Sequence, residues 1–297
     1  MCGATVLLLT AELAATSPID PPLLPPLKWA GGKRWLIPTL KILWESHQAR
    51  RLVEPFCGGL AIALGLQPAR ALLNDLNPHL INFYQQIQRG LSITIPMRNE
   101  APLYYAQRAR FNELIRQGNV ETAEHAELFY YLNRTDFNGL CRFNHSGEFN
   151  VPFGSYKTIN YAADFLAYQS TLAQWTFQAG SFERIICQPD DFIYADPPYD
   201  VEFVSYSKEG FSWVDQIRLV EWLAAHPGPV ALSNQATDRI VTLYEQYGFT
   251  LIYLLSPRRI SSTGDRTPAR EVLALKNIAI DDELLARSVG AQLSASS

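Results

Sequence analysis

The residues best suited to chemistry in this chain are Asp196, Pro197 and Tyr199, in the sequence Asp-Pro-Pro-Tyr directly after the apolar run Phe192–Ala195. This order places a carboxylate, a backbone carbonyl and an aromatic ring at the end of an expected strand. An exocyclic amine on a flat nitrogenous ring needs all three, because the two oxygens can accept its N–H groups while the aromatic ring stacks on the heterocycle. The prolines fix φ and remove backbone donors that would compete for those acceptors. The alternative is that Asp-Pro-Pro simply ends a strand and begins a loop.

A second set of residues has the spacing of a nucleotide-binding unit. An expected strand at 51–53 is followed by the turn Gly58–Gly59, a helix over 60–67, and a strand at 71–73 that leads to Asp75. Glycines in such a turn let backbone N–H groups approach a ligand, and a helix N-terminus favours negative charge. An acidic residue about twenty positions on can bind both hydroxyls of a ribose. Together these features predict a nucleoside-containing cofactor without saying which; the alternative role for Asp75 is a helix N-cap.

The segment Leu27–Lys33 brings cations, a tryptophan and two glycines together. A lysine after Gly-Gly resembles part of a P-loop, but Arg34 stands where that motif requires Ser or Thr, so ATP hydrolysis is not supported. Trp29 and Lys33 can instead cap a nucleoside cofactor and pair with its carboxylate. The alternative is that the tryptophan packs in the core and the lysine lies on the surface.

The stretch 133–144 alternates amides, arginines and aromatic residues. Arginine can read guanine through two hydrogen bonds, asparagine can bind bases or phosphates, and an aromatic ring can wedge between base steps. These side chains therefore indicate contact with a DNA duplex. The alternative is a hairpin stabilised by its own aromatic residues.

Apolar periodicity predicts the elements that hold these residues in place. Further strands are expected at 192–195, 230–232 and 249–255, with helices at 213–225 and 238–246. The alternation of strands and helices predicts an α/β fold with a doubly wound, Rossmann-like sheet.

The middle of the chain has a different pattern, with helical stretches at 104–117 and 121–132 and then a polar loop up to residue 156. We therefore expect a mostly helical insertion in the α/β domain. The expected division is an extension and linker over 1–26, a catalytic domain over 27–80 and 186–277, a target-recognition insertion over 81–185, and a tail over 278–297.

Composition limits the class of protein. Of the 297 residues, 47% are hydrophobic and 18% are charged, and no stretch is long enough to span a bilayer. No basic residue precedes the apolar run at 6–9, so a secretory signal is not expected. The four cysteines form no CxxC pair and the histidines do not cluster, so we expect neither a metal site nor a disulfide framework, and a reducing cytoplasm fits best.

The net charge of −4 alone argues against a nucleic-acid partner, but the cations are unevenly spread. One basic segment runs from Lys28 to Arg51 and contains a single acidic residue, Glu45; a second runs from Arg258 to Arg270. Local basic patches, rather than net charge, form a phosphate footprint. Solvated surface charge is the alternative for each of these residues.

The combination of these motifs resembles the Dam family of DNA adenine-N6 methyltransferases, in which the cofactor motifs precede the recognition insertion and the Asp-Pro-Pro-Tyr motif follows it. The resemblance covers about residues 27–276. The matching segments are Leu27–Lys33, Val53–Gly59, Asn74–Asp75, Asn133–Arg142, Gly147–Gly154, Asp196–Tyr199, Arg259–Ser262 and Glu271–Leu273.

The resemblance implies S-adenosylmethionine as the cofactor and no metal. It implies that a flipped adenine is held by Asp196, Pro197 and Tyr199 as the catalytic residues. The positions that match cofactor contacts in the family are Trp29, Lys33, Glu54, Pro55, Phe56, Gly58, Asp75 and Asp196.

The resemblance also implies double-stranded DNA as the partner, with GATC as the expected site. Arg142 and Lys28 match positions that contact guanines, and Leu140 matches one that lies against a thymine methyl group. Phe137 and Asn138 match positions at the opened base stack. The positions that match phosphate contacts are Arg134, Asn144 and Asn150.

Four residues depart from the family pattern. Leu60 stands where a third small residue is more common, so the cofactor turn is expected to be tighter. Asp136 and Phe137 stand where the enzyme of enteric bacteria has Gly and Tyr, and a carboxylate at Asp136 near phosphates would weaken binding. Ser155 replaces an arginine, which removes one expected contact to the DNA backbone.

Several interpretations stay open. The substrate could be another DNA sequence or an amine in RNA or protein, although an amide substrate would favour Asn at position 196; a catalytically silent DNA-binding homologue is the third alternative. We expect a monomer on DNA in a bacterial-type, nucleoid-associated cytoplasmic setting. Whether a cognate restriction endonuclease acts in the same system stays open.

Overall fold

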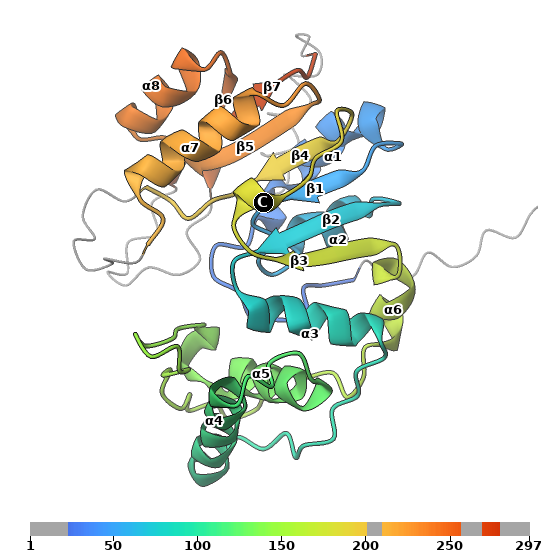
Figure 1. The fold of residues 1–297 in the computed structure, drawn as a ribbon, viewed down its shortest axis with the longest axis vertical. Coiled ribbons are helices and arrows are strands. Elements are labelled where there is room, and N and C mark those ends of the chain that lie inside the picture. The colour runs from blue at the N-terminus through green and yellow to red at the C-terminus, as the bar shows by residue number, and fades with distance from the viewer. Residues whose placement is uncertain (1–22, 201–209, 257–268, 280–297) are drawn as a thin grey trace, which may run out of the picture.

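The computed structural model describes residues 23–200, 210–256 and 269–279. Within them the chain forms a seven-stranded sheet in the order β3-β2-β1-β4-β5-β7-β6 (Figure 1). Strands β1 to β5 run parallel, whereas β7 lies antiparallel between β5 and β6. The strands are β1 (Leu52–Glu54), β2 (Ala71–Asp75), β3 (Trp175–Ala179), β4 (Phe192–Ala195), β5 (Val230–Gln235), β6 (Thr250–Ser256) and β7 (Ala269–Lys276). The expected α/β fold with a Rossmann-like sheet is confirmed.

Helices cover both faces of the sheet, because successive strand residues point to opposite sides and the strands carry apolar side chains on both. Leu52 and Leu73 belong to the core on one face, and their neighbours Val53 and Leu72 belong to the core on the other. The first face is covered by α1 (Ile37–Trp44), α2 (Ala61–Leu66) and α3 (Pro78–Gln88), and the second by α7 (Trp213–Ala224) and α8 (Asp238–Gln246).

The helical lobe at the bottom of Figure 1 contains α4 (Ala101–Arg116) and α5 (Ala123–Thr135). Helix α5 packs against both α3 and α4, and the rings of Phe83 and Tyr130 stack with centroids 5.6 Å apart where α3 meets α5. The lobe therefore shares its core with one face of the sheet. A further helix, α6 (Leu166–Leu172), leads from the lobe back to β3.

The strand β3 lies inside the range 81–185 that the sequence assigned to the insertion. It nevertheless pairs with β2 along five residues, so this part of the range belongs to the sheet. The sequence signal was weak because β3 is an edge strand, where Thr176 and Gln178 alternate with the apolar positions Trp175 and Phe177. Strand β7 was not expected as a strand at all. The other domain boundaries stay a prediction.

Several expected features lie outside the described residues. They are most of the extension (1–22), the greater part of the second basic segment (258–268) and the tail from 280 onward. No helix in the described ranges is long and apolar enough to cross a membrane.

Candidate active site

Asp196 follows the last residue of β4, so it lies at the carboxyl end of the parallel strands, where open α/β sheets bind their ligands. Its two carboxylate oxygens have different partners. Lys33 Nζ lies 3.3 Å from Oδ2, and Ser233 Oγ on β5 donates to Oδ1 at 2.9 Å. The hydroxyl of Tyr194 lies 2.8 Å from Ser233 Oγ. Three segments of the chain thus fix the orientation of one carboxylate.

Burial raises the pKa of Asp196 to about 6, although Lys33 and the hydrogen bond from Ser233 act in the opposite direction. The negative charge of Glu271 adds to the increase in pKa. At pH 7 Asp196 is therefore mostly a carboxylate, which can accept hydrogen bonds from an amine. Below about pH 6 it becomes protonated and loses that capacity.

Tyr199 has a defined partner on each side. Lys33 Nζ lies 4.4 Å from the centroid of its ring, and its hydroxyl donates to Glu271 Oε2 at 2.6 Å. The preceding loop is held by Gln216 of α7, whose side-chain amide donates to the Pro198 carbonyl at 2.9 Å. Contacts from the segment before α1, from α7 and from β7 therefore hold the ring and its loop.

The glycine turn after β1 is bound to the end of β2. Asp75 Oδ2 accepts from the Gly58 N–H at 3.1 Å, and its Oδ1 accepts from the Asn77 N–H at 3.0 Å. The N-cap of α3 is Asn77, so the alternative role of Asp75 as the helix cap is wrong. Burial raises the pKa of Asp75, while these backbone hydrogen bonds favour its charged form. The turn after Gly58 includes Leu60, whose φ of 62° is a left-handed backbone conformation at a residue other than glycine.

Trp29 packs on this turn so closely that a side chain at Gly58 or Gly59 would collide with it. A Cβ atom at either glycine would lie 2.9 Å from an atom of the Trp29 side chain. The glycines are therefore needed for the approach of the tryptophan as well as for the turn.

These elements enclose a cavity of about 780 Å³ at the carboxyl ends of β1, β2 and β4. All the residues predicted to contact the cofactor or to act in catalysis line it: Trp29, Lys33, Glu54, Pro55, Phe56, Gly58, Asp75, Asp196, Pro197 and Tyr199. The volume is within the range of small-molecule sites, about 300–1,000 Å³. Its wall includes Phe182 and Phe211, which sequence reasoning missed.

Two polar groups of this cavity are suited to a charged ligand. Glu54 is buried, its Oε1 has no hydrogen-bond partner within the described structure, and burial raises its pKa well above the usual value. Lys33 is the nearest cation to Asp196 among the ion pairs of the described residues. A ligand with both an amine and a carboxylate would therefore find complementary groups at this end of the cavity.

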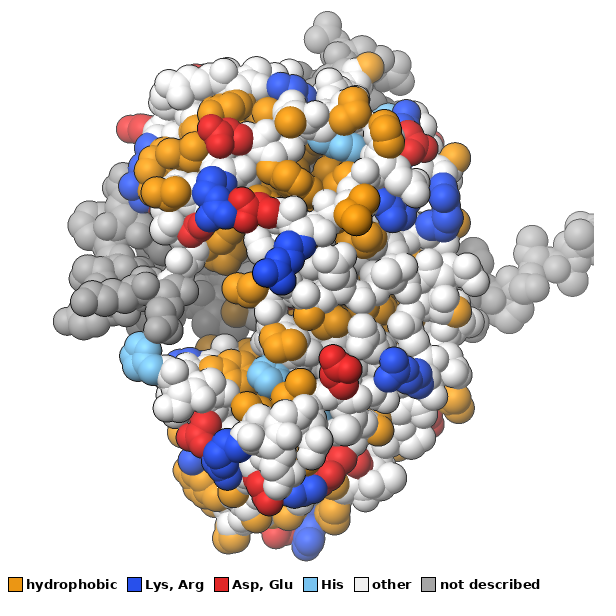
Figure 2. All heavy atoms as spheres, in the orientation of Figure 1, with side chains coloured by type: hydrophobic (Ala, Val, Ile, Leu, Met, Phe, Trp, Pro, Cys, Tyr) orange, Lys and Arg blue, Asp and Glu red, His pale blue; other side chains and the backbone are white. Residues whose placement is uncertain are grey.

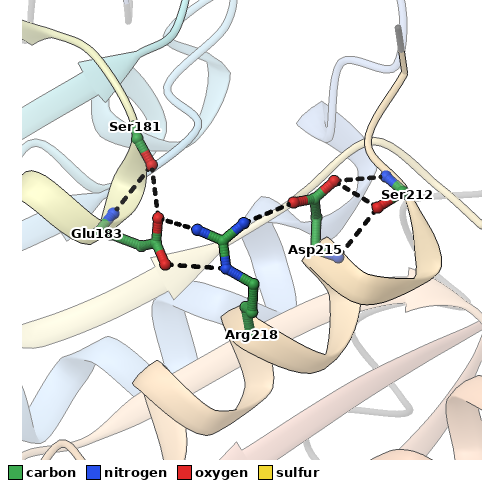
Figure 3. A network of polar contacts seen from close by, with 5 residues as sticks. All are labelled: Ser181, Glu183, Ser212, Asp215 and Arg218. Carbon is green, nitrogen blue, oxygen red and sulfur yellow. Dashed lines mark hydrogen bonds and ion pairs between the residues drawn. The ribbon is translucent and has the colours of Figure 1, made fainter. Parts of the chain in front are cut away.

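The rim of the cavity is held by a polar network (Figure 3). Arg218 on α7 lies between Glu183, which follows β3, and Asp215, one turn earlier on α7. Its Nε donates to Glu183 Oε1 at 3.0 Å and its Nη1 donates to Asp215 Oδ1 at 3.1 Å. Ser212 completes a capping box with Asp215. The network joins the loop after β3 to the first turns of α7.

A second cavity of about 810 Å³ lies between the catalytic sheet and the helical lobe. It shares Trp29, Lys33 and Tyr199 with the first cavity, and its wall also contains Glu271 and Tyr161. The two cavities therefore meet at Lys33 and Tyr199.

The residues predicted to read the DNA bases gather around a short hairpin that follows α5. Phe137 and Leu140 are 50% and 38% exposed, and Asn138 is held in a left-handed conformation at a φ of 61°. Arg142 is exposed, and its Nε donates to Asn150 Oδ1 at 2.8 Å. Lys28 lies beside this hairpin, with its Nζ 3.9 Å from the centroid of the Tyr156 ring.

The residues predicted to bind phosphate have internal partners in this structure. Arg134 donates to the Pro26 carbonyl, and its guanidinium lies over the Tyr130 ring. Asn144 Oδ1 accepts from two backbone N–H groups of the hairpin, and Asn150 accepts from Arg142. These side chains stabilise the hairpin and the segment before Lys28. To bind phosphate they must therefore share or exchange these internal hydrogen-bond partners.

The expectation for Asp136 is wrong. Its side chain is fully buried instead of lying near phosphates, and neither carboxylate oxygen has a hydrogen-bond partner in the described structure. Burial raises its pKa to about 8, against the opposing effects of the nearby Gly139 backbone N–H and of the Lys28 charge. Asp136 is therefore mostly neutral at pH 7 and adds little negative charge to the hairpin.

The surface charge on one side of the molecule is mixed. Figure 2 shows Lys and Arg side chains interspersed with Asp and Glu, and the surface is hollowed at the left between the sheet and the helical lobe. Among the side chains coloured in this view, cations do not gather into one broad patch. On this face of the described part of the chain, therefore, no broad cationic surface is available for phosphate groups.

Comparison with known proteins agrees with this site. Residues 29–257 match the model of a family described as D12 class N6 adenine-specific DNA methyltransferase. The chain belongs to this family. It is 34% identical over 263 residues to the retron Ec67 DNA adenine methylase of Escherichia coli, covering 84% of this chain and 90% of that protein. It is 36% identical over 272 residues to a DNA adenine methylase of Vibrio cholerae and 34% identical over 270 residues to that of Escherichia coli K12, covering 84% of this chain and 94% of each relative.

The chain is therefore an adenine-specific DNA methyltransferase, as the motifs indicated. The resemblance identified from the sequence is confirmed. Sequence reasoning missed three polar residues near Asp196 and Tyr199, namely Tyr194, Ser233 and Glu271. Glu271 stood in a matching segment, but no pattern assigned it a role; Tyr194 and Ser233 lay in apolar strand segments, where short polar residues carry no recognisable signal.

Proposed function

We propose that this methyltransferase uses S-adenosylmethionine to methylate N6 of an adenine that is flipped out of a DNA duplex at GATC sites. The supporting observation is that Lys33 and Tyr199 line both cavities, while Asp196 lines the first and lies 3.3 Å from Lys33 Nζ. One cavity then accommodates the methyl donor and the other the extruded base.

The residues of the first cavity fit S-adenosylmethionine. Asp75 at the end of β2 can bind the ribose hydroxyls, and Phe56, Phe182 and Phe211 form an apolar wall for the adenine ring. Lys33 can pair with the carboxylate of the donor, while the unpartnered Glu54 oxygen suits its ammonium group. When bound, S-adenosylmethionine supplies an electrophilic methyl group on a positively charged sulfur.

The role of the protein in the reaction is mainly to position the amine. The Asp196 carboxylate and the Pro197 carbonyl accept the two N6–H bonds, which localises the nitrogen lone pair that the adenine ring otherwise withdraws. Tyr199 stacks on the extruded ring, since base flipping costs a few kcal/mol that contacts in the pocket must offset. Because the methyl group is already activated, orientation can supply much of the rate enhancement.

Sequence recognition is assigned to the hairpin after α5. The half-exposed Phe137 and left-handed Asn138 are suited to occupy an opened base stack, Leu140 to contact a thymine methyl group, and Arg142 and Lys28 to read guanines. Arg134, Asn144 and Asn150 are proposed to contribute phosphate contacts after exchange of their internal partners. We further propose that the protein acts as a monomer in a bacterial-type cytoplasm, with a cognate endonuclease as an optional partner.

The test is methyl transfer from labelled S-adenosylmethionine to an unmethylated plasmid, mapped by protection from nucleases that adenine methylation blocks. Asp196→Ala is expected to abolish transfer, and Asp190→Ala, which removes an exposed aspartate, serves as the matched control. Protection confined to GATC supports the proposal. N6-methyladenine at other sites would overturn the roles given to Arg142 and Leu140, and absence of DNA methylation would overturn the function.

The pH dependence tests the protonation state of Asp196. Because burial raises its pKa to about 6, kcat/KM should fall roughly tenfold per pH unit below that value as the carboxylate becomes protonated. Measurements of kcat/KM between pH 5 and 8 define this limb. A flat profile across that range would mean that the reaction does not require the ionised carboxylate.

A further inference from the structure

Glu271 is a buried carboxylate whose contact in the structure is with the catalytic tyrosine. It is 6% exposed, and its Oε2 accepts from the Tyr199 hydroxyl at 2.6 Å. Among the ion pairs formed by described residues, none involves Glu271. Burial of a charged group is unfavourable unless hydrogen bonds compensate it, so this short bond is a principal interaction for both groups.

The backbone that holds Glu271 is rigid. The residue lies on β7, which pairs with strands on both sides: Glu271 is opposite Gln235 of β5 and Leu254 of β6. By contrast, Tyr199 lies in a loop after β4. The hydrogen bond therefore joins a loop side chain to an inner strand of the sheet, which fixes the far end of the tyrosine ring.

Tyr199 is the side chain at which the two cavities meet, and Glu271 lines the second of them. The face of the ring is in contact with Lys33 Nζ at 4.4 Å, and the hydroxyl at its far end is held by Glu271. Rotation of the ring would break the bond to Glu271 and change the surface that is presented between the cavities.

We propose that Glu271 is a positioning residue, whose carboxylate holds the Tyr199 ring in the orientation that stacks on the target adenine. This inference rests on the proposed function. Glu271 does not touch the reacting atoms in this scheme; it acts through the tyrosine hydroxyl, and its loss lets the ring rotate away from the base.

Glu271 also acts on Asp196 through its charge. The titratable and charged groups that face Asp196 are Lys33 from the segment before α1, Glu54 from β1, Tyr194 from β4, Tyr199 from its own loop, Tyr244 from α8 and Glu271 from β7. Of these, Glu271 raises the pKa of Asp196 and Lys33 lowers it. A neutral residue at 271 should therefore move the acid limb of the pH profile to lower pH.

Two substitutions separate the hydrogen bond from the charge. Glu271→Gln keeps an oxygen that can accept from the tyrosine hydroxyl but removes the charge, whereas Glu271→Ala removes both. We expect kcat to fall about tenfold or more in Glu271→Ala and to stay within about threefold of wild type in Glu271→Gln. Both variants should show the acid limb at lower pH. Glu245→Ala, which removes an exposed glutamate on α8, is the matched control.

Tyr199→Phe provides the decisive background. Because the phenylalanine has no hydroxyl, Glu271→Ala should cause little further loss of kcat in that variant, which gives a non-additive double-mutant cycle. The affinity for S-adenosylmethionine and the urea midpoint of unfolding are measured in each variant, and both should stay close to wild type in Glu271→Gln.

The outcomes distinguish this inference from the proposed function. If wild type transfers no methyl group to DNA, the function itself fails. If wild type is active, the inference is overturned when Glu271→Ala retains full kcat, when its loss persists in the Tyr199→Phe background, or when Glu271→Gln is as impaired as Glu271→Ala. Rescue by Gln together with a non-additive cycle supports it.

Discussion

The buried carboxylate of Asp136 should make the stability of the protein depend on pH in a way that one substitution removes. Burial raises the folded-state pKa of Asp136 from 3.8 to about 8. A pKa that is raised on folding contributes stability that is fully present below the unfolded value of about 4 and is lost as the pH rises through about 8. Between these limits the unfolded chain has released this proton and the folded chain has kept it.

The size of the effect follows from the proton count. Each unit of pH in this window lowers the free energy of unfolding by about 1.4 kcal/mol for one proton retained by the folded state. Between pH 5 and pH 7.5 the contribution of Asp136 therefore falls by about 3 kcal/mol. Asp136→Asn has the same shape but no proton to release, so it lacks this slope.

Urea unfolding of wild type and Asp136→Asn at several pH values between 5 and 7.5 measures the difference. The free energy of unfolding of wild type minus that of the variant should decrease by about 3 kcal/mol over the range, while other titrating groups cancel. Asp190→Asn, at an exposed aspartate, should run parallel to wild type. A difference between wild type and Asp136→Asn that stays constant with pH would refute the argument, because Asp136 would then be ionised in the folded protein.

Two substitutions at glycines test the close contacts of the two lobes. Gly154→Ala would place a Cβ atom 2.2 Å from the Asp136 carbonyl oxygen, a backbone atom, so it should lower the free energy of unfolding by about 1–3 kcal/mol in urea titrations; an unchanged midpoint would show that the hairpin shifts freely. Gly58→Ala combines a φ of 43° with a Cβ 2.9 Å from Trp29 Nε1, so the affinity for S-adenosylmethionine should fall about tenfold or more by isothermal titration. Gly118→Ala, at a φ of 74° with open space around it, is the matched control for backbone strain alone.

The residues that sequence reasoning located are those in short motifs at strand ends. Asp75 and Asp196 each follow an apolar strand, and parallel strands bring their carboxyl ends to one edge, so their place in one cavity could be expected. Prolines and glycines gave additional signal, because proline restricts the backbone conformation and glycine permits conformations that other residues rarely adopt. The order of these motifs along the chain then indicated the family.

The residues that escaped prediction act through contacts between distant strands. Ser233 reaches Asp196 across 37 positions and Glu271 reaches Tyr199 across 72. Such pairs depend on the order of strands in the sheet, which apolar periodicity does not specify. The burial of Asp136 was missed for a similar reason: its charge indicated a surface position, while the packing of the hairpin against α4 and α5 encloses it.

The position of β7 in the sheet has a consequence for how the enzyme is made. Among the described strands β7 is the last in the sequence, yet it lies between β5 and β6 and carries Glu271. On the ribosome, β5 and β6 are therefore synthesised before the strand that joins them, and each keeps an unpaired edge until residues 269–276 emerge. A nascent chain that has already formed its cofactor turn and its Asp-Pro-Pro-Tyr loop still lacks Glu271, the residue that accepts the hydrogen bond from Tyr199. Methylation should thus begin only when synthesis has passed β7, and chains truncated before it should be prone to aggregate.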